Sequence, residues 1–383
     1  MKTLQRCTKC LKDKPEKDME QRCQCGEPLE FEYQRGEVRK RGSVWNRYRN
    51  FYSFDISDSY SLGEGDTSLT RLNKLSSDLD IELFAKNETT NPTWSFKDRG
   101  TFLGVQHAVK NGYSKIGTVS TGNMAVSIAA YGARFGQDTS ILVSKDIDEI
   151  KLSQIGIYGP KIYRVDGDYG KLYFRSLEIG KEKNIYFINS DNPYRVEGYK
   201  TIGFEIAEGF IPDHVLIPTS SGGLFRGIVK SFLELKKSGI ISKLPEFTSV
   251  QAQGCSPIYD AFKDRENEIS PVKEKNTIAK AISNPYPPSG NEVLRILNDI
   301  DGECIAVRDK EIMNSQKELA TESIFAQLAG CVGIAAAEKM EKEGLIKRGD
   351  KVVSIITGSG LKTTNYNANS NITDVDIDDL EII

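Results

Sequence analysis

The chain has 383 residues, which is too long for one small hydrophobic core and predicts two or three compact units. Its net charge is only −3, so no strong field draws it to nucleic acid or to an anionic membrane. No segment approaches the roughly 18 consecutive apolar residues of a membrane span, and the first residues lack the apolar run of a signal peptide. We therefore expect a cytoplasmic protein that binds small molecules rather than nucleic acid or membranes.

The chain is poor in histidine, with only His107 and His214. This scarcity argues against Ser-His-Asp, Cys-His and histidine-ligated metal centres. His107 lies in a helical pattern and is expected to be an ordinary helix residue. Of the seven cysteines, Cys255, Cys304 and Cys331 lie apart in apolar or mixed surroundings, which is typical of reduced, buried thiols.

The other four cysteines form two close pairs near the N-terminus, Cys7-x2-Cys10 and Cys23-x-Cys25. Such short spacings let two sulfurs reach one tetrahedral ion, as in a rubredoxin-like zinc knuckle. The second pair is C-x-C rather than C-x2-C, and the alternative is a knuckle without metal. We predict a zinc-ribbon-like segment over residues 1–34.

From about residue 80 onward, short apolar runs alternate with helical patterns. Strands are expected at 81–86, 116–120, 138–144, 161–167, 184–190, 213–220 and 351–360, and helices at 96–112, 124–136 and 223–239. This alternation predicts an α/β architecture with parallel sheets covered on both faces. Ligands of such sheets bind at the carboxyl ends of the strands. The tail after residue 362 is rich in Asn and Thr and then acidic, which predicts a weakly ordered surface extension.

One polar cluster surrounds Lys97 in the stretch NPTWSFKDRG, residues 91–100. The lysine comes at the start of a helix, directly after a turn marked by Asn91 and Pro92. A lysine that forms a Schiff base must lie in a dry pocket where its pKa can fall. The neighbours expected to fix the turn are Ser95, Phe96, Asp98 and Arg99. The alternative is a solvated salt bridge with little energetic effect.

Two further clusters follow predicted strands. In VSTGNMAVS, residues 119–127, a strand turns into a helix whose free backbone N–H groups suit a carboxylate. The alternative is that Ser120 or Thr121 is a simple N-cap. In IPTSSGGLFRG, residues 217–227, backbone amides and serine hydroxyls can bind a phosphate, without the pattern of a Walker A or dinucleotide motif. A reactive lysine with two anion sites suggests pyridoxal phosphate.

The order of these blocks resembles the threonine synthase family, among pyridoxal-phosphate enzymes of the tryptophan-synthase-β type (fold type II). The blocks are residues 61–72, 91–100, 120–136, 192–201, 250–262 and 356–362. The resemblance implies two open, mostly parallel sheets flanked by helices, with the cofactor in the cleft between them, plus the small N-terminal cysteine knuckle. It also implies a large cofactor domain of residues 35–100 and 204–362, a small domain of residues 101–203 and a tail of residues 363–383.

The resemblance also implies roles in cofactor binding. Lys97 would bind pyridoxal phosphate as a Schiff base and act as general base and acid, with Phe96 packed beside it. Asn123 would hydrogen-bond the phenolic oxygen, and Thr357 would meet the pyridine nitrogen. The loop expected to bind the phosphate consists of Ser220, Ser221, Gly222, Gly223 and Leu224.

The residues expected to contact the substrate are Ser120, Thr121, Gly122, Asn192, Arg195 and Lys200. The first three would hold the substrate carboxylate, and the last three would form a polar, cationic patch for a phosphate leaving group. For Arg195 and Lys200 the alternative is a surface ion pair with Glu197. Enzymes of this type are commonly homodimers, and we expect the same here.

The chain departs from the family pattern at four places. Trp94 stands where the family usually has Gly, and residues 220–224 replace a Gly-Asn-x-Gly-Asn loop. Residues 358–360 replace Gly-His-Gly, and residues 325–330, FAQLAG, replace a Phe-x-Glu-Pro block. Backbone amides still suit the cofactor phosphate, whereas the lost polar side chains and the added indole alter the substrate cavity.

The resemblance predicts conversion of O-phospho-L-homoserine and water to L-threonine and phosphate. Because of Trp94, the alternative is β-replacement or elimination on O-phosphoserine or another amino acid, as in relatives similar to cysteate synthases or dehydratases. A binding protein that keeps the fold without catalysis is the third hypothesis.

Overall fold

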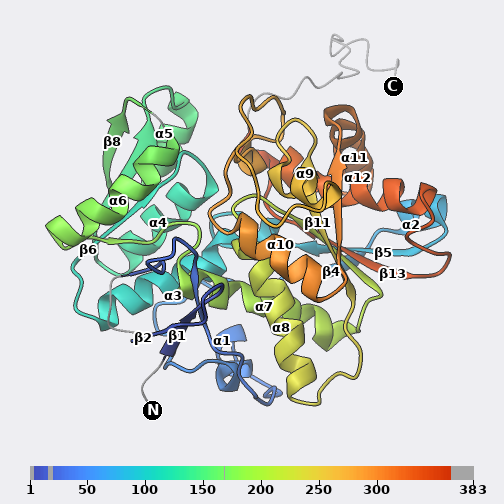
Figure 1. The fold of residues 1–383 in the computed structure, drawn as a ribbon, viewed down its shortest axis with the longest axis horizontal. Helices are drawn as coiled ribbons and strands as arrows, with labels where there is room; N and C mark the ends of the chain where they lie inside the picture. Colours follow the sequence, from blue (N-terminus) through green and yellow to red (C-terminus); the bar gives the residue numbers. More distant parts are fainter. Residues whose placement is uncertain (1–3, 16–19, 168, 364–383) are drawn as a thin grey trace, which may run out of the picture.

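The computed structural model describes residues 4–15, 20–167 and 169–363, and the predicted tail therefore lies almost wholly outside the described residues. The described residues form three sheets, which Figure 1 shows with their flanking helices. None of the helices in these ranges is long and apolar enough to cross a bilayer.

The largest sheet has six strands. In spatial order they are β12 (Glu303–Val307), β11 (Glu246–Ala252), β10 (His214–Pro218), β13 (Lys351–Ile356), β5 (Glu82–Asn87) and β4 (Leu69–Arg71). All neighbours pair in parallel except β4, which runs antiparallel to β5 at the edge. Every residue of β10 is buried, as expected for a central strand covered on both faces.

The second sheet has four parallel strands. In spatial order they are β8 (Lys161–Val165), β7 (Asp138–Ser144), β6 (Lys115–Val119) and β9 (Tyr186–Phe187). Figure 1 shows this sheet, with α4 (Asn123–Arg134), α5 (Glu149–Gly156) and α6 (Tyr169–Lys183), on the opposite side of the molecule from the six-stranded sheet. The two parallel sheets flanked by helices confirm the predicted fold class.

Helices α3 (Lys97–Lys110) and α7 (Pro193–Gly209) join the two sheets into one core. Helix α7 packs against both α3 and α8 (Gly223–Lys237). One continuous hydrophobic cluster runs from Ile116 and Ile141 of the four-stranded sheet to Val215 and Val353 of the six-stranded sheet. The remaining helices are α1 (Val44–Arg47), α2 (Asn73–Leu79), α9 (Pro257–Lys263), α10 (Gly290–Asp299), α11 (Asp309–Thr321) and α12 (Leu328–Lys342).

The N-terminal residues form a small antiparallel sheet of β2 (Asp13–Pro15), β1 (Leu4–Cys7) and β3 (Leu29–Phe31). Its cysteine cluster and the three free, buried thiols farther along the chain agree with the sequence predictions. His107 is a buried residue of α3, also as predicted.

The observed elements differ from the predicted ones mainly at their ends. Strand β9 is shorter than predicted, because only Tyr186 and Phe187 pair in the sheet before the chain turns toward α7. Strand β13 ends at Ile356, and the residues after it turn back across the front of α3. Short 3₁₀ turns cover Arg49–Phe51, Glu88–Thr90, Lys280–Ile282 and Gly360–Lys362.

Candidate active site

The turn before α3 is fixed by Asp98. Its carboxylate accepts hydrogen bonds from the backbone N–H of Thr93 at 2.6 Å, the hydroxyl of Thr93 at 2.6 Å and the hydroxyl of Ser127 at 2.6 Å. Within the same turn, the backbone of Trp94 lies in the left-handed region, with φ of 62°. The predicted role of Asp98 as a residue that holds this turn is therefore visible in its contacts.

Lys97 is the first residue of α3 and is only partly exposed. Its ammonium lies 4.3 Å from the centre of the Phe96 ring and makes no hydrogen bond or ion pair with any residue in the described part of the chain. Burial, and secondarily the positive charge of Arg195, lowers the pKa of Lys97 to about 7. Near neutral pH a large fraction of this amine is therefore uncharged and nucleophilic.

The segment after β13 lies directly against this turn. The backbone N–H of Phe96 donates to Thr357 O at 3.1 Å, and that of Ser359 donates to Trp94 O at 3.0 Å. Ser95 and Gly358 form an isolated antiparallel bridge between these two bonds. Residues separated by more than half the chain thus meet beside Lys97.

Three polar side chains converge on Gly358. A Cβ atom at this glycine would lie 3.1 Å from Gln327 Oε1, 3.2 Å from Asn123 Nδ2 and 3.4 Å from Ser95 Cβ. The Asn123 amide donates to Gln327 Oε1 at 2.7 Å, and the buried Ser95 hydroxyl has no hydrogen-bond partner among the described residues. A side chain at position 358 would therefore crowd the polar groups of Gln327 and Asn123.

Gln327 is a site residue that the sequence reasoning did not select. It lies at the N-cap position of α12 and contacts Asn123, which is 204 positions away in the sequence. In the sequence, the FAQLAG block could have indicated this residue, because Gln327 stands where the Phe-x-Glu-Pro pattern has glutamate.

The start of α4 offers free donors. The hydroxyl of Ser120 accepts from Gly122 N at 3.3 Å, and α4 begins without a side-chain cap. The first backbone N–H groups of the helix, from Asn123 onward, are therefore not occupied by Ser120 or Thr121, contrary to the simple N-cap alternative.

The loop after β10 has the shape of an anion cradle. Gly222 has φ of 92°, and α8 begins after it without a side-chain cap. A Cβ at Gly222 would lie 2.9 Å from Ser289 Cβ and 2.9 Å from Val293 Cγ2, so this position requires glycine. The uncapped start of a helix of 15 residues suits a phosphate, and the serines at 220 and 221 add hydroxyls beside it.

Arg195 is a fully buried cation without a carboxylate partner in the described ranges. Its Nη1 donates to Thr101 Oγ1 at 2.8 Å and its Nη2 to Tyr199 Oη at 2.7 Å, while its Nε has no partner. Thr101 lies four residues after Lys97 in α3, and the charge of Arg195 contributes to the lowered pKa of Lys97. The alternative for Arg195, an ion pair with Glu197, is not observed.

Asn192 is the N-cap of α7. Its side chain accepts from Tyr194 N at 3.0 Å and donates to Tyr186 Oη at 3.0 Å. These bonds fix the start of the helix that carries Arg195.

Lys200 does not join the predicted cationic patch. Its ammonium is fully buried, donates to Phe51 O at 2.7 Å and pairs with Glu197 at 2.6 Å and Glu234 at 3.0 Å. Five residues along an α-helix rotate a side chain by about 140°, so Lys200 points away from the side of α7 that carries Arg195. The pairing with Glu197 that the sequence suggested at the surface occurs in the interior.

Trp94 is 49% exposed, so it is not packed into the core, and its predicted effect on the substrate cavity stays a prediction. The left-handed backbone at this residue turns its side chain away from the direction that an extended residue would give it.

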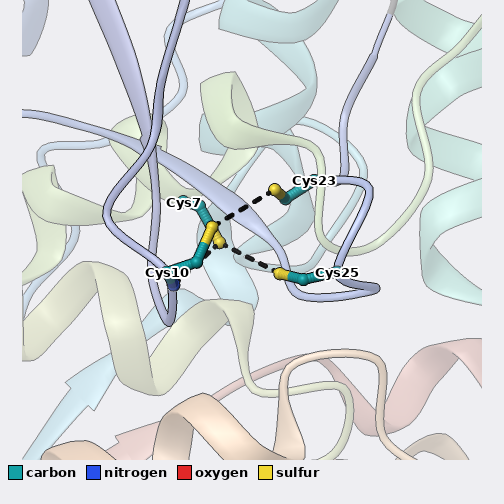
Figure 2. Close-up of side chains that lie close together, drawn as sticks. All are labelled: Cys7, Cys10, Cys23 and Cys25. Atoms are coloured by element: carbon teal, nitrogen blue, oxygen red, sulfur yellow. Dashed lines mark hydrogen bonds between the residues drawn. The ribbon is translucent and has the colours of Figure 1, made fainter.

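The four N-terminal cysteines converge, as Figure 2 shows. The Sγ atoms of Cys7 and Cys25 are 3.4 Å apart and those of Cys10 and Cys23 are 3.6 Å apart, and all four lie within 4.8 Å of one another. Two of them are buried and two are exposed. This grouping is the arrangement that a tetrahedral metal ion requires.

Comparison with known proteins agrees with this site. The model of the family described as "Pyridoxal-phosphate dependent enzyme" matches residues 60–358. The threonine synthase of Methanocaldococcus jannaschii is 40% identical, over 94% of this chain and 93% of that protein. That of Methanosarcina acetivorans is 34% identical, over 84% of this chain and 80% of that protein.

Solved structures agree in fold. Threonine deaminase isoform 2 of Solanum lycopersicum superposes with a TM-score of 0.68 at 20% identity, over 82% of this chain and 81% of that chain. Maize serine racemase gives a TM-score of 0.67 at 21% identity, over 77% of this chain and 88% of that chain. Taken with the matches in sequence, these results show that the chain belongs to the threonine synthase family of pyridoxal-phosphate-dependent enzymes.

Proposed function

We propose that this protein converts O-phospho-L-homoserine and water to L-threonine and phosphate. The observation that carries the proposal is Arg195, a buried cation that donates to Thr101 of α3 and lacks a carboxylate partner among the described side chains. Burying an uncompensated charge is costly, and a bound phosphate group would supply the missing negative charge. The threonine synthases among its relatives support the choice of substrate.

The residues around Lys97 suit pyridoxal phosphate. The unpaired amine of Lys97 is the group to which its aldehyde would attach, and the uncapped start of α8 at Gly223 suits its phosphate. Asn123 and Thr357 would hold the ring, and glycine at position 358 avoids a side chain that would crowd Asn123. When bound, the cofactor supplies an electron sink that stabilises negative charge on the substrate carbons.

The chain's own groups position the substrate and move protons. The free N–H groups at the start of α4, with Ser120 and Thr121 before them, would bind the substrate carboxylate. Lys97, with a pKa of about 7, can both accept and release a proton at neutral pH. Arg195 would hold the phosphate leaving group, and Asn192 would position Arg195 by starting α7.

O-phosphoserine is the substrate of the second candidate reaction, and it differs from O-phosphohomoserine by one methylene group. Because one methylene changes selectivity only about 10- to 200-fold, both compounds must be assayed. We expect phosphate to be released at least about tenfold faster from O-phosphohomoserine than from O-phosphoserine. Release from O-phosphoserine alone would contradict the proposed reaction.

The cysteine cluster would hold one structural Zn²⁺. Zn–S bonds of about 2.3 Å in a tetrahedron place the sulfurs about 3.8 Å apart, close to the separations of 3.4 and 3.6 Å in the cluster. The backbone N–H groups of Lys9 and Cys10 both point at Cys7 Sγ, each at 3.4 Å, which stabilises a thiolate ligand. One zinc per chain, lost in Cys23→Ser, is the expected result of a metal assay.

The homodimer, the cytoplasmic location and the domain boundaries stay predictions. Light scattering of the purified protein tests the homodimer, and cell fractionation tests the location.

A further inference from the structure

The residues just before Cys23 contact strand β9 and the loops that precede α7 and α10. Here the cysteine knuckle means residues 4–15 and 20–31. Within it, the Arg22 guanidinium pairs with the Asp191 carboxylate and donates to Pro288 O at 3.0 Å. The adjacent Gln21 side chain donates to Phe187 O in β9. The knuckle therefore contacts the main body through the two residues directly before Cys23, a predicted metal ligand.

The first of these contacts leads to the substrate side of the site. Asp191 is fully buried, accepts a second hydrogen bond from Tyr173 Oη, and precedes Asn192, the N-cap of α7. Arg195 lies in the first turn of that helix. The carboxylate that pairs with Arg22 thus lies in the turn directly before α7, the helix that carries Arg195.

The second contact leads to the phosphate cradle. Pro288 precedes Ser289, whose backbone N–H donates to Ser221 O at 3.0 Å. The Cβ of Ser289 closes over Gly222, at 2.9 Å from the position that a Cβ there would take. Arg22 therefore bridges the turn before α7 and the segment that covers the cradle at the start of α8.

The knuckle has little apolar core of its own. Its hydrophobic cluster consists of Cys7, Cys23 and Leu29, far fewer residues than an independent fold needs. Metal binding supplies folding free energy in small domains of this kind. The position of Arg22 then depends on whether the cysteines hold an ion.

We propose that a Zn²⁺ ion in the cysteine cluster holds Arg22 in place as a clamp between the two halves of the active site. The inference rests on the proposed cofactor and zinc sites and adds a role for the ion. Without the ion, Arg22 loses its fixed position and the buried Asp191 loses its charge partner, so the turn before α7 and the cradle loosen together. The other ion pairs each reach one region of the body: Glu27 pairs with Arg295 of α10 at 2.8 Å, and Glu20 pairs with Lys181 of α6 at 3.7 Å.

The test compares Arg22→Ala, Cys23→Ser and the double variant in the full-length protein. The matched control is Arg6→Ala, because Arg6 is a partly exposed knuckle residue whose ion pairs are with Asp13 and with Glu32, the residue directly after the knuckle. The measurements are zinc per chain, the dissociation constant of pyridoxal phosphate, and amide hydrogen exchange of the segments 187–192 and 286–290.

We expect Arg22→Ala to keep its zinc, to bind pyridoxal phosphate about tenfold more weakly and to exchange faster in both segments. Cys23→Ser should lose the zinc and show the same two changes, and the double variant should be no worse than Cys23→Ser, because both act through one contact. Arg6→Ala should match the wild type. If Cys23→Ser does not fold, chelation of the wild-type zinc followed by its return should weaken and then restore binding.

Arg22→Ala with wild-type cofactor affinity and wild-type exchange would overturn the clamp even if zinc is present. A wild type that contains no zinc and does not respond to added zinc would overturn the role of the metal. If the wild type does not bind pyridoxal phosphate, the proposed function fails, and hydrogen exchange alone still decides whether Arg22 joins the two segments.

Discussion

Arg195 Nη1 donates to Thr101 Oγ1 at 2.8 Å, four residues after Lys97 in α3, and after burial the charge of Arg195 is the second cause of the lowered pKa of Lys97. A buried cation without a carboxylate partner among the described residues gains stability when an anion binds to it. This relationship links the cofactor lysine to the phosphate of the proposed substrate.

Arg195→Gln tests this link. Removing the neighbouring charge should raise the pKa of Lys97 and should raise the KM for O-phosphohomoserine at least tenfold, because a charged hydrogen bond is lost. Arg164→Gln, which changes an exposed arginine paired with Glu149, is the control and should leave both quantities unchanged. An unchanged KM in Arg195→Gln would remove Arg195 from substrate binding.

The stability of the cofactor-free protein should depend on pH through Lys97. The folded state holds this lysine at a pKa of about 7, whereas the unfolded chain keeps it near 10.5. Between pH 7 and pH 10.5 the unfolded state binds more protons than the folded state, so the free energy of unfolding rises with pH in this range. Below pH 7 the buried lysine destabilises the folded state by its full amount. Lys97→Met should therefore raise the free energy of unfolding by about 4 to 5 kcal/mol at pH 6.5 and by less than about 1 kcal/mol at pH 10. An equal change at both pH values, in denaturant titrations, would contradict the lowered pKa.

Gln327 is expected to position Asn123. Gln327→Leu removes the oxygen that accepts from Asn123 Nδ2, and should weaken pyridoxal phosphate binding about three- to tenfold and shift the visible absorption of the bound cofactor. Gln327→Glu keeps an oxygen acceptor at the same place and should bind the cofactor nearly as well as the wild type. Equal affinity in the leucine and glutamate variants would show that the contact with Asn123 does not matter.

A buried ion network should make Arg99 essential for stability. Its guanidinium pairs with Glu88 at 2.6 Å and with Glu205 at 2.6 Å, all fully or nearly fully buried. Burial alone would raise the pKa of Glu205, but the charges of Arg99 and Lys86 hold this pKa at about 2. Arg99→Leu leaves two buried carboxylates without this partner and should cost about 3 to 5 kcal/mol in denaturant titrations. Arg175→Leu, at an exposed arginine paired within α6, should cost less than about 1 kcal/mol.

The sequence predicted the elements well where local pattern decides them. Strand β7 has the bounds that its apolar run predicted, and α3 begins at Lys97, one residue after the predicted start. Helices α4 and α8 also begin, without side-chain caps, directly after the glycine and hydroxyl residues where the sequence predicted helix starts.

Contacts between distant segments could not be read from the sequence. The hydrogen bond between Asn123 and Gln327 depends on where the start of α12 lies relative to the start of α4. Lys200 has a buried partner on α8, Glu234, that the helical pattern of α7 does not reveal, because periodicity identifies a face but not what covers it. Trp94 adopts a left-handed conformation that is uncommon for a bulky residue, and nothing in the sequence indicated it.

The proposed reaction is tested most directly by measuring L-threonine formed from O-phospho-L-homoserine by the purified protein with pyridoxal phosphate, beside Lys97→Ala under the same conditions. We expect one threonine for each phosphate released by the wild type, and no threonine above background from Lys97→Ala. Phosphate released without threonine, or threonine formed at an undiminished rate by Lys97→Ala, would contradict the proposed reaction.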